Sequence, residues 1–123
     1  MREIKFKVKI KGDAKLWEVY VIDFLHLQVL RNVSGSYEMV SFDKIEAFLQ
    51  FTGLLDRNGR EVWEGDILLT DEGGWIAQVD FVRGCFVLQN HTVKMGGFSV
   101  EPNWEECEVI GTVWENPELL EDK

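Results

Sequence analysis

The chain has 123 residues, of which 46% are apolar and 28% are charged, and its formal net charge at pH 7 is -9. This length favours a single domain, and the composition excludes disordered, collagen-like and low-complexity proteins. No apolar run approaches the roughly 18 residues of a membrane span, and the N-terminal segment lacks the hydrophobic stretch of a secretory signal. Two cysteines at a wide spacing indicate neither a disulfide framework nor a zinc site, so we expect a cytoplasmic protein.

The charge is unevenly distributed along the chain. Residues 1–60 hold ten Lys and Arg against eight Asp and Glu, whereas residues 61–123 hold three against fourteen. The first part therefore carries +2 and the second -11. The two parts can neutralise each other within one molecule, or they can meet a partner or a second copy. Non-specific nucleic-acid binding is not favoured by this net charge, because phosphate contacts need Lys and Arg.

The first predicted strand, residues 4–11, alternates apolar with basic side chains in the sequence IKFKVKIK. This period of two indicates a half-buried strand, and a row of lysines is one way in which sheets protect an edge from unwanted pairing. The basic strip also offers three candidate binding residues, namely Lys5, Lys7 and Lys9.

Further β-rich runs follow at residues 16–33 and 37–40, with a break at Ser34-Gly35-Ser36. Residues 41–51 fit both a helical face and a strand, and we expect a short helical turn that leads into a strand.

The second half of the chain contains short strands at near-regular spacing. The expected strands are residues 54–55, 60–63, 67–70, 75–81, 85–89 and 108–114, with a longer loop over 91–104 and one helical turn after Asn116. This pattern is typical of a small antiparallel barrel. We therefore predict a mainly β chain with at most one short helix. Residues 1–46 would form an N-terminal β extension, and residues 47–123 the barrel core.

Residues 51–67 resemble the core signature of the YopX family, with the sequence FTGLLDRNGREVWEGDI. The opening REIKFK and the later segment EVIGTVWENPELL are similar to the two ends of that family. The resemblance implies an SH3-like β-barrel and an origin in phages or prophages of Gram-positive bacteria. The molecular function of the family is not established, so no catalytic residue is carried over.

The polar residues of this segment have an explanation in turn chemistry. They are Asp56, Asn58, Gly59, Glu64, Gly65 and Asp66. Asn58-Gly59 tolerates positive φ, and the Asp56 carboxylate can accept backbone N–H bonds in a turn. A calcium loop needs a Glu at its twelfth position, which is Ile67 here. Glu64 and Asp66 could serve as an acid/base pair, but a tight bend accounts for both.

Two other kinds of chemistry find weak support. Cys85 with His26 or His91 could form a nucleophile and its base, but Cys85 lies in an apolar strand and reads as a buried, inert thiol. Four other residues could in principle hold a metal, but their spacing fits no known ligand set. They are His91, Glu101, Glu105 and Glu106. We therefore expect no enzyme, no metal and no cofactor.

Five tryptophans are the strongest binding candidates. Trp17 and Trp75 lie in clear strand patterns, and we expect them in the core. The candidate binding residues are Trp63, Trp104 and Trp114, because SH3-like barrels often bind peptides or nucleic acids through aromatic side chains. The same three side chains could instead pack inside the fold or at a subunit contact.

The sequence supports one main hypothesis and two alternatives. The main hypothesis is a noncatalytic phage or prophage accessory protein that acts by macromolecular contact as a homo-oligomer, with a host or phage protein as a further partner. The first alternative is an acidic decoy that occupies the nucleic-acid-binding groove of a host protein. The second alternative is a hydrolase that uses Cys85 or the Glu64 and Asp66 pair.

Overall fold

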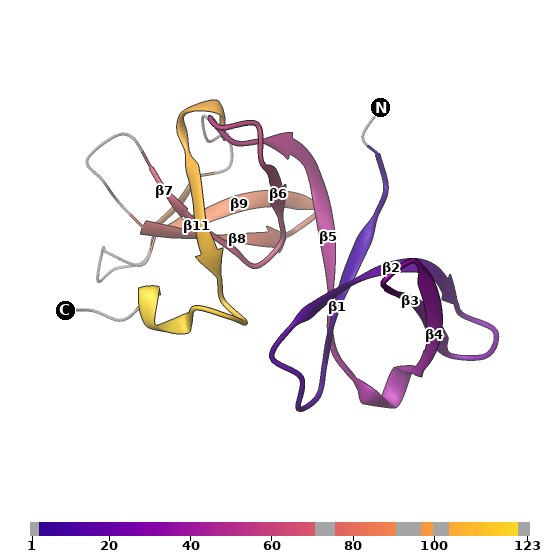
Figure 1. Ribbon diagram of the computed structural model, residues 1–123. Coiled ribbons are helices and arrows are strands. Elements are labelled where there is room, and N and C mark those ends of the chain that lie inside the picture. The colour runs from indigo at the N-terminus through magenta and orange to yellow at the C-terminus, as the bar shows by residue number, and fades with distance from the viewer. Residues whose placement is uncertain (1–2, 71–75, 91–96, 100–103, 121–123) are drawn as a thin grey trace. The chain divides into compact units, whose positions relative to one another are not determined.

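The computed structural model describes residues 3–70, 76–90, 97–99 and 104–120 (Figure 1). The elements in chain order are β1 (Phe6–Ile10), β2 (Leu16–Asp23), β3 (Gln28–Val33), β4 (Ser36–Ser41), η1 (Phe42–Lys44), β5 (Ile45–Leu55), β6 (Glu61–Trp63), β7 (Asp66–Leu69), β8 (Ile76–Val82), β9 (Cys85–Asn90), β10 (Gly97–Ser99), η2 (Trp104–Glu106), β11 (Glu108–Thr112) and η3 (Pro117–Leu120). The helical elements of the described residues are the three short 3-10 turns η1, η2 and η3. The chain is therefore mainly β, as the sequence predicts. None of these described helical turns is of a length and character that would cross a membrane.

The strands form two antiparallel sheets. The first has the order β4-β3-β2-β1-β5-β6, and the second has the order β10-β9-β8-β7-β11. Neither order returns to its first strand among the described residues, so the SH3-like closed barrel is not confirmed.

The chain divides into two compact units. Residues 4–50 form one, and residues 51–123 with the first three residues form the other. Strand β5 runs from the first unit into the second, so the expected boundary after residue 46 falls inside this strand.

In the unit of residues 4–50, β1 lies inside the sheet. It pairs with β2 on one side and with β5 on the other, and Val8 is fully buried. The interpretation of the lysine row as protection for an edge is therefore wrong, because β1 has no free edge. The outer strand on this side of the sheet is β4.

Residues 16–33 form a hairpin rather than one continuous run. The carboxylate of Asp23 accepts the backbone N–H bonds of Leu25 and His26, and Leu27 has a positive φ of 53°. This side-chain bonding turns the chain after β2, and the apolar alternation alone did not reveal it. The helical turn expected before the next strand is confirmed, since η1 leads directly into β5.

The core of the other unit is one apolar cluster from β6, β7, β8, β9 and β11. Its buried members are Val62, Leu68, Ala77, Val79, Leu88, Cys107 and Val109. Strand β8 shows the origin of this core: Ala77 and Val79 are buried, while Gln78 and Asp80, which alternate with them, are only partly buried. Alternation with period two thus places one face of each strand in the cluster.

We expect Leu68→Ala to lower the free energy of unfolding by about 2–5 kcal/mol, because it removes a fully buried side chain and leaves a cavity. Leu55→Ala is the matched control, since the Leu55 side chain is half exposed. Urea unfolding followed by fluorescence measures both. Equal losses in the two variants would contradict the assigned core.

Candidate functional site

The turn after β5 is organised by the carboxylate of Asp56. Its Oδ1 accepts hydrogen bonds from the backbone N–H groups of Asn58 and Arg60, both at 2.9 Å. Its Oδ2 accepts the N–H of Val109 on β11, also at 2.9 Å. Gly59 has a φ of 78°, which a glycine adopts without strain. One buried carboxylate therefore closes the turn and joins it to a strand 53 residues further along the chain.

Burial of the Asp56 carboxyl by itself raises its pKa, since burial disfavours the charged form. The N–H donors of Val109, Arg60 and Asn58, with the nearby charge of Arg60, act in the opposite direction and leave the pKa below its ordinary value. The carboxylate is thus held in the ionised form that the turn needs.

The second bend of the signature is also held by a carboxylate. Oδ2 of Asp66 accepts the backbone N–H of Trp63 at 2.8 Å, and Asp66 is buried. Between them, Gly65 has a φ of 87° and lies against the indole of Trp114. Asp66 therefore bonds the backbone in this bend, and Glu64 beside it is half-buried.

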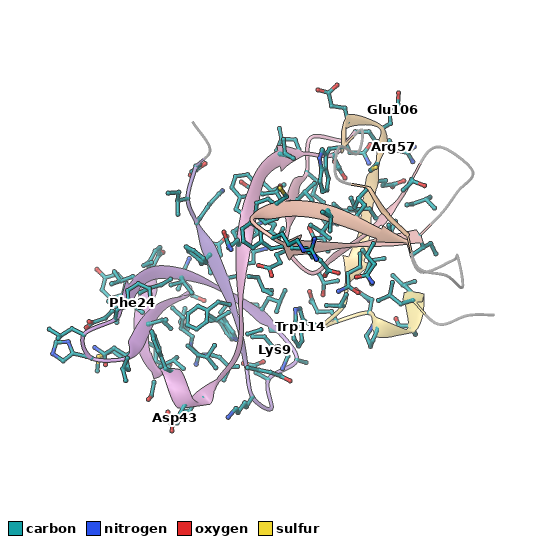
Figure 2. The ribbon with its side chains drawn as sticks, turned by 180° about the vertical axis from the view of Figure 1, so that it is seen from behind. Lys9, Phe24, Asp43, Arg57, Glu106 and Trp114 are labelled. Atoms are coloured by element: carbon teal, nitrogen blue, oxygen red, sulfur yellow. The ribbon has the colours of Figure 1, made fainter. Side chains whose placement is uncertain are left out.

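The three candidate tryptophans have different surroundings. Trp63 is only 5% exposed and its ring packs against Phe51, with centroids 5.3 Å apart. Trp104 on η2 is half-buried against the core cluster, and Trp114, labelled in Figure 2, is half-buried beside Gly65. Trp63 therefore packs in the interior, and the other two keep only part of their surface exposed. Trp75 lies outside the described residues.

The candidate lysines do not form an exposed strip. Lys9 (Figure 2) is only 9% exposed, and its Nζ lies 3.2 Å from a carboxylate oxygen of Glu46 and 3.0 Å from the carbonyl oxygen of Ile10. Lys5 and Lys7 are half-buried, and each has an interaction partner. Lys7 and Lys9 lie in the interior strand β1, which explains their burial, and Lys5 directly precedes it.

The structure describes only some of the thiol and metal candidates. Cys85 is exposed, which corrects the expectation of a buried thiol, whereas Cys107 is buried in the core. His26 is paired with Asp23 at 2.7 Å, and His91 lies outside the described residues. Glu105 and Glu106 are exposed on η2, while Glu101 lies outside the described part. Within that part, no three His, Cys, Asp or Glu side chains could share a metal ion.

Sequence reasoning missed a cluster of charges around Trp17. Its indole N–H donates to Asp13 at 2.8 Å, and the cations of Lys15 and Arg31 lie 4.5 Å and 4.3 Å from the ring centroid. Arg31 also pairs with Glu38 at 2.6 Å. Open cavities of about 390 and 490 Å³ flank the cluster. Trp17 is thus half-buried among charges rather than in the apolar core, and its neighbours are already paired with one another.

A second feature that the sequence pattern did not reveal is an apolar face on the sheet of β2, β3 and β4. Tyr20 and Val21 on β2 and Tyr37 and Met39 on β4 are all exposed, Tyr37 by 68% and Met39 by 65%. Val21 is opposite Leu30, and Leu30 is opposite Met39, so the three side chains form one row across the sheet. The rings of Tyr20 and Tyr37 meet edge to face at 5.6 Å. We call these five residues the β2–β4 face.

The β2–β3 hairpin ends in three further exposed apolar residues, which are Phe24, Leu25 and Leu27. Phe24, labelled in Figure 2, keeps one edge-to-face contact with Phe42 but is 74% exposed. The unit of residues 4–50 therefore holds most of the exposed large apolar side chains of the described chain.

The model of the YopX protein family matches residues 5–121, which is nearly the whole chain. The chain belongs to the YopX protein family. Among solved structures, this YopX protein resembles the crystal structure of protein EF1440 from Enterococcus faecalis, with a TM-score of 0.67 and 23% sequence identity. The match covers 98% of this chain and 100% of the other. No curated protein matches the chain. The solved structure supports the fold of this YopX protein.

We expect Asp56→Asn to lower the free energy of unfolding by about 2 kcal/mol, because hydrogen bonds to a charged group are lost in a buried site. The effect depends on pH. Since the folded pKa lies below the unfolded value of about 4, the contribution of Asp56 is present above about pH 4 and is lost as the pH falls through the folded pKa.

Urea unfolding from pH 7 to pH 2 measures this difference. Glu118→Gln is the matched control, because it removes one exposed carboxylate from η3. A gap between the wild type and Asp56→Asn that stays constant over this range would contradict the assigned role.

We expect Gly65→Ala to destabilise the protein more than Gly59→Ala. Both glycines have positive φ, which costs an alanine about 1 kcal/mol. At Gly65 the added Cβ would also lie 3.2 Å from Nε1 of Trp114, whereas at Gly59 it would meet nothing within 4 Å. Chemical unfolding of the two variants separates the packing term from the backbone term, and equal losses would show that Trp114 does not pack on this bend.

Proposed function

We propose that this YopX protein is a noncatalytic phage or prophage accessory protein that acts by macromolecular contact and self-associates through the β2–β4 face. The observation that supports this proposal best is the exposed apolar surface of that face. A host or phage protein would be a further partner. The protein would act in the cytoplasm of the bacterial host. The two free cysteines are consistent with that reducing compartment.

The size of the β2–β4 face supports a contact role. From their exposed fractions, its four exposed side chains present on the order of 500 Å² of accessible surface. The largest apolar patch of a typical monomer is about 300–600 Å² and is often functional. A patch of this size is therefore large enough to take part in a contact between molecules.

The charge around the face supports a second copy as the partner. Residues 4–50 contain seven Lys and Arg and six Asp and Glu, which gives this unit a net charge of +1. Two such units can approach each other with little repulsion, and they offer little attraction to a strongly charged ligand. This near-neutral charge favours self-association over nucleic-acid binding as the role of the β2–β4 face.

The signature residues support a role other than catalysis. The carboxylates of Asp56 and Asp66 are buried and bonded to backbone N–H groups, so turn formation already explains them. The exposed residue Cys85 lies between Gly84 and Phe86 in the sequence. Neither of these neighbours is a histidine that could serve as its base. An SH3-like barrel for residues 47–123 remains a prediction, and the proposal does not depend on it.

We expect Tyr37→Glu to weaken self-association at least tenfold, because it places a carboxylate in the apolar face. Sedimentation equilibrium over a range of protein concentrations measures the association constant. Leu55→Glu is the matched control, since Leu55 is also exposed but lies on β5 in the other unit. A monomer at every concentration, with or without the substitution, would disprove the proposed self-association.

The charge distribution supports a second candidate function, the acidic decoy. Residues 51–123 hold five Lys and Arg against fifteen Asp and Glu, a net charge of -10. Glu105, Glu106, Glu115 and Glu118 are exposed in this unit. Affinity of a decoy for a basic host protein falls steeply with salt, whereas contact through the apolar face changes little. A salt series on a captured host protein distinguishes the two functions.

A further inference from the structure

We propose that two copies of the chain pair through the outer edges of their β4 strands, antiparallel, with Met39 opposite the partner's Met39. The inference rests on the proposed self-association and narrows it: the copies meet at the β4 side of the β2–β4 face, with Tyr37 and Met39 at the junction, and the two faces continue each other in one sheet. It predicts one continuous sheet across two molecules, related by a two-fold axis that passes beside Met39.

The outer edge of β4 is available for pairing. β4 is the last strand in the sheet order, and all six of its residues pair with β3 without a register shift. No strand among the described residues pairs with its other side. A regular edge strand of this kind presents a row of N–H and C=O groups to a partner strand.

Strand β4 also lacks the usual protection of an edge. Its sequence is SYEMVS, which contains neither lysine nor proline, and its ladder with β3 has no bulge. The single charge of β4, on Glu38, is paired with Arg31 at 2.6 Å. The lysine-rich strand β1, which could have protected an edge, lies inside the sheet instead.

The hydrogen bond from the N–H of Phe42 to the carbonyl of Leu27, at 2.8 Å, fixes which groups of β4 point outward. This pair continues the register in which Ser41 is opposite Gln28. N–H and C=O groups alternate sides along a strand, so those of the even-numbered residues of β4 face β3. Those of Tyr37, Met39 and Ser41 therefore face outward.

Only one symmetric register uses all three outward residues. In an antiparallel pair, two residues directly opposite each other have their side chains on the same face of the sheet. When a two-fold axis relates the two strands, it therefore passes between one residue and the same residue of the partner. With Met39 on the axis, Met39 pairs with the partner's Met39, and Tyr37 pairs with the partner's Ser41. All outward N–H and C=O groups of Tyr37, Met39 and Ser41 are then bonded.

The neighbouring register is less favourable for two reasons. With Glu38 on the axis, Ser41 has no partner within β4, so fewer main-chain bonds form. The two Glu38 carboxylates would also lie directly opposite each other, which is destabilising. In the Met39 register, Glu38 lies opposite the partner's Val40 instead.

The same register joins the apolar faces of the two copies. Met39 already continues the row that Val21 and Leu30 form across the sheet. Pairing with the partner's Met39 extends this row across the two-fold axis. The contact of the two Met39 side chains and the main-chain bonds of β4 thus form together, which is why we infer this partner rather than an unrelated peptide.

Site-directed cross-linking tests the register. Met39→Cys is made in a Cys85→Ser background, because Cys85 is exposed and Cys107 is buried. The full chain is treated with a short reagent that carries two maleimides, each of which adds one cysteine thiol across its C=C bond, and is analysed by denaturing electrophoresis. We expect rapid formation of a covalent dimer. Glu38→Cys lies opposite the partner's Val40 in this register, two residues out of line with its own copy, and should react at least tenfold more slowly. The same holds for Asp43→Cys, which is exposed beyond the strand.

A second variant tests the main-chain bonds. Met39→Pro removes an N–H that points away from β3, so the fold should tolerate it while the dimer dissociation constant rises at least tenfold. Circular dichroism checks the fold. If this variant does not fold, Met39→Lys serves the same purpose, because an edge lysine opposes pairing.

The outcomes separate this inference from the proposed function. A chain that dimerises in sedimentation but cross-links no faster at position 39 than at 43 would overturn the β4 pairing and leave self-association standing. Faster linking at position 38 than at 39 would overturn the register. A monomer at all concentrations would overturn both proposals. Rapid linking at position 39 alone, with a weaker dimer for the β4 variant, supports the inference.

Discussion

The carboxylate of Asp56 is the interaction on which the unit of residues 51–123 depends. It bonds backbone N–H groups within its own turn and one on β11, so a single buried group joins the start of the unit to its last strand. The main chain adds to the same link, because the N–H of Arg57 bonds the carbonyl of Cys107 at 2.9 Å. Hydrogen bonds to a buried charge stabilise the fold strongly when all of them form. The loss of one bond lowers the free energy of unfolding markedly, because a charged oxygen is then left buried without its partner. The polar residues that stand out in the sequence are therefore explained by folding before any ligand is invoked.

The two units of the chain differ in how they use their side chains. The unit of residues 51–123 gathers buried apolar residues of several strands in one cluster and carries most of the acidic charge. The unit of residues 4–50 is nearly neutral and leaves aromatic and apolar side chains such as Tyr37, Met39 and Phe24 exposed. An exposed apolar face beside an unprotected strand edge is expensive to keep in water and prone to pairing. Its presence is the reason to look for function in contact and assembly.

Membership of the YopX protein family bears on the fold of the chain. The family model covers almost the whole chain, and the solved structure of EF1440 shares its fold over nearly its full length at 23% identity. At that level of identity the shared property is the fold. The segment by which the family is recognised contains Asp56, Gly65 and Asp66, and each of them has a structural role here. The signature residues therefore stabilise turns of the fold. The exposed apolar surface lies elsewhere, on β2, β3 and β4.

The sequence by itself determined the β class, most strand positions, the helical turn before β5 and the turn chemistry of Asp56, because these depend on local periodicity and on bonds between near neighbours. The sequence did not predict the features that depend on residues close in space but distant in the chain. Only the tertiary structure placed β1 inside a sheet, which buried Lys9, and β4 at the edge, which exposed Tyr37 and Met39. It also gave Trp17 a charged surrounding and Cys85 an exposed position. Alternation tells which side chains share a face of a strand, but the order of strands in the sheet decides whether that face or edge meets protein or water.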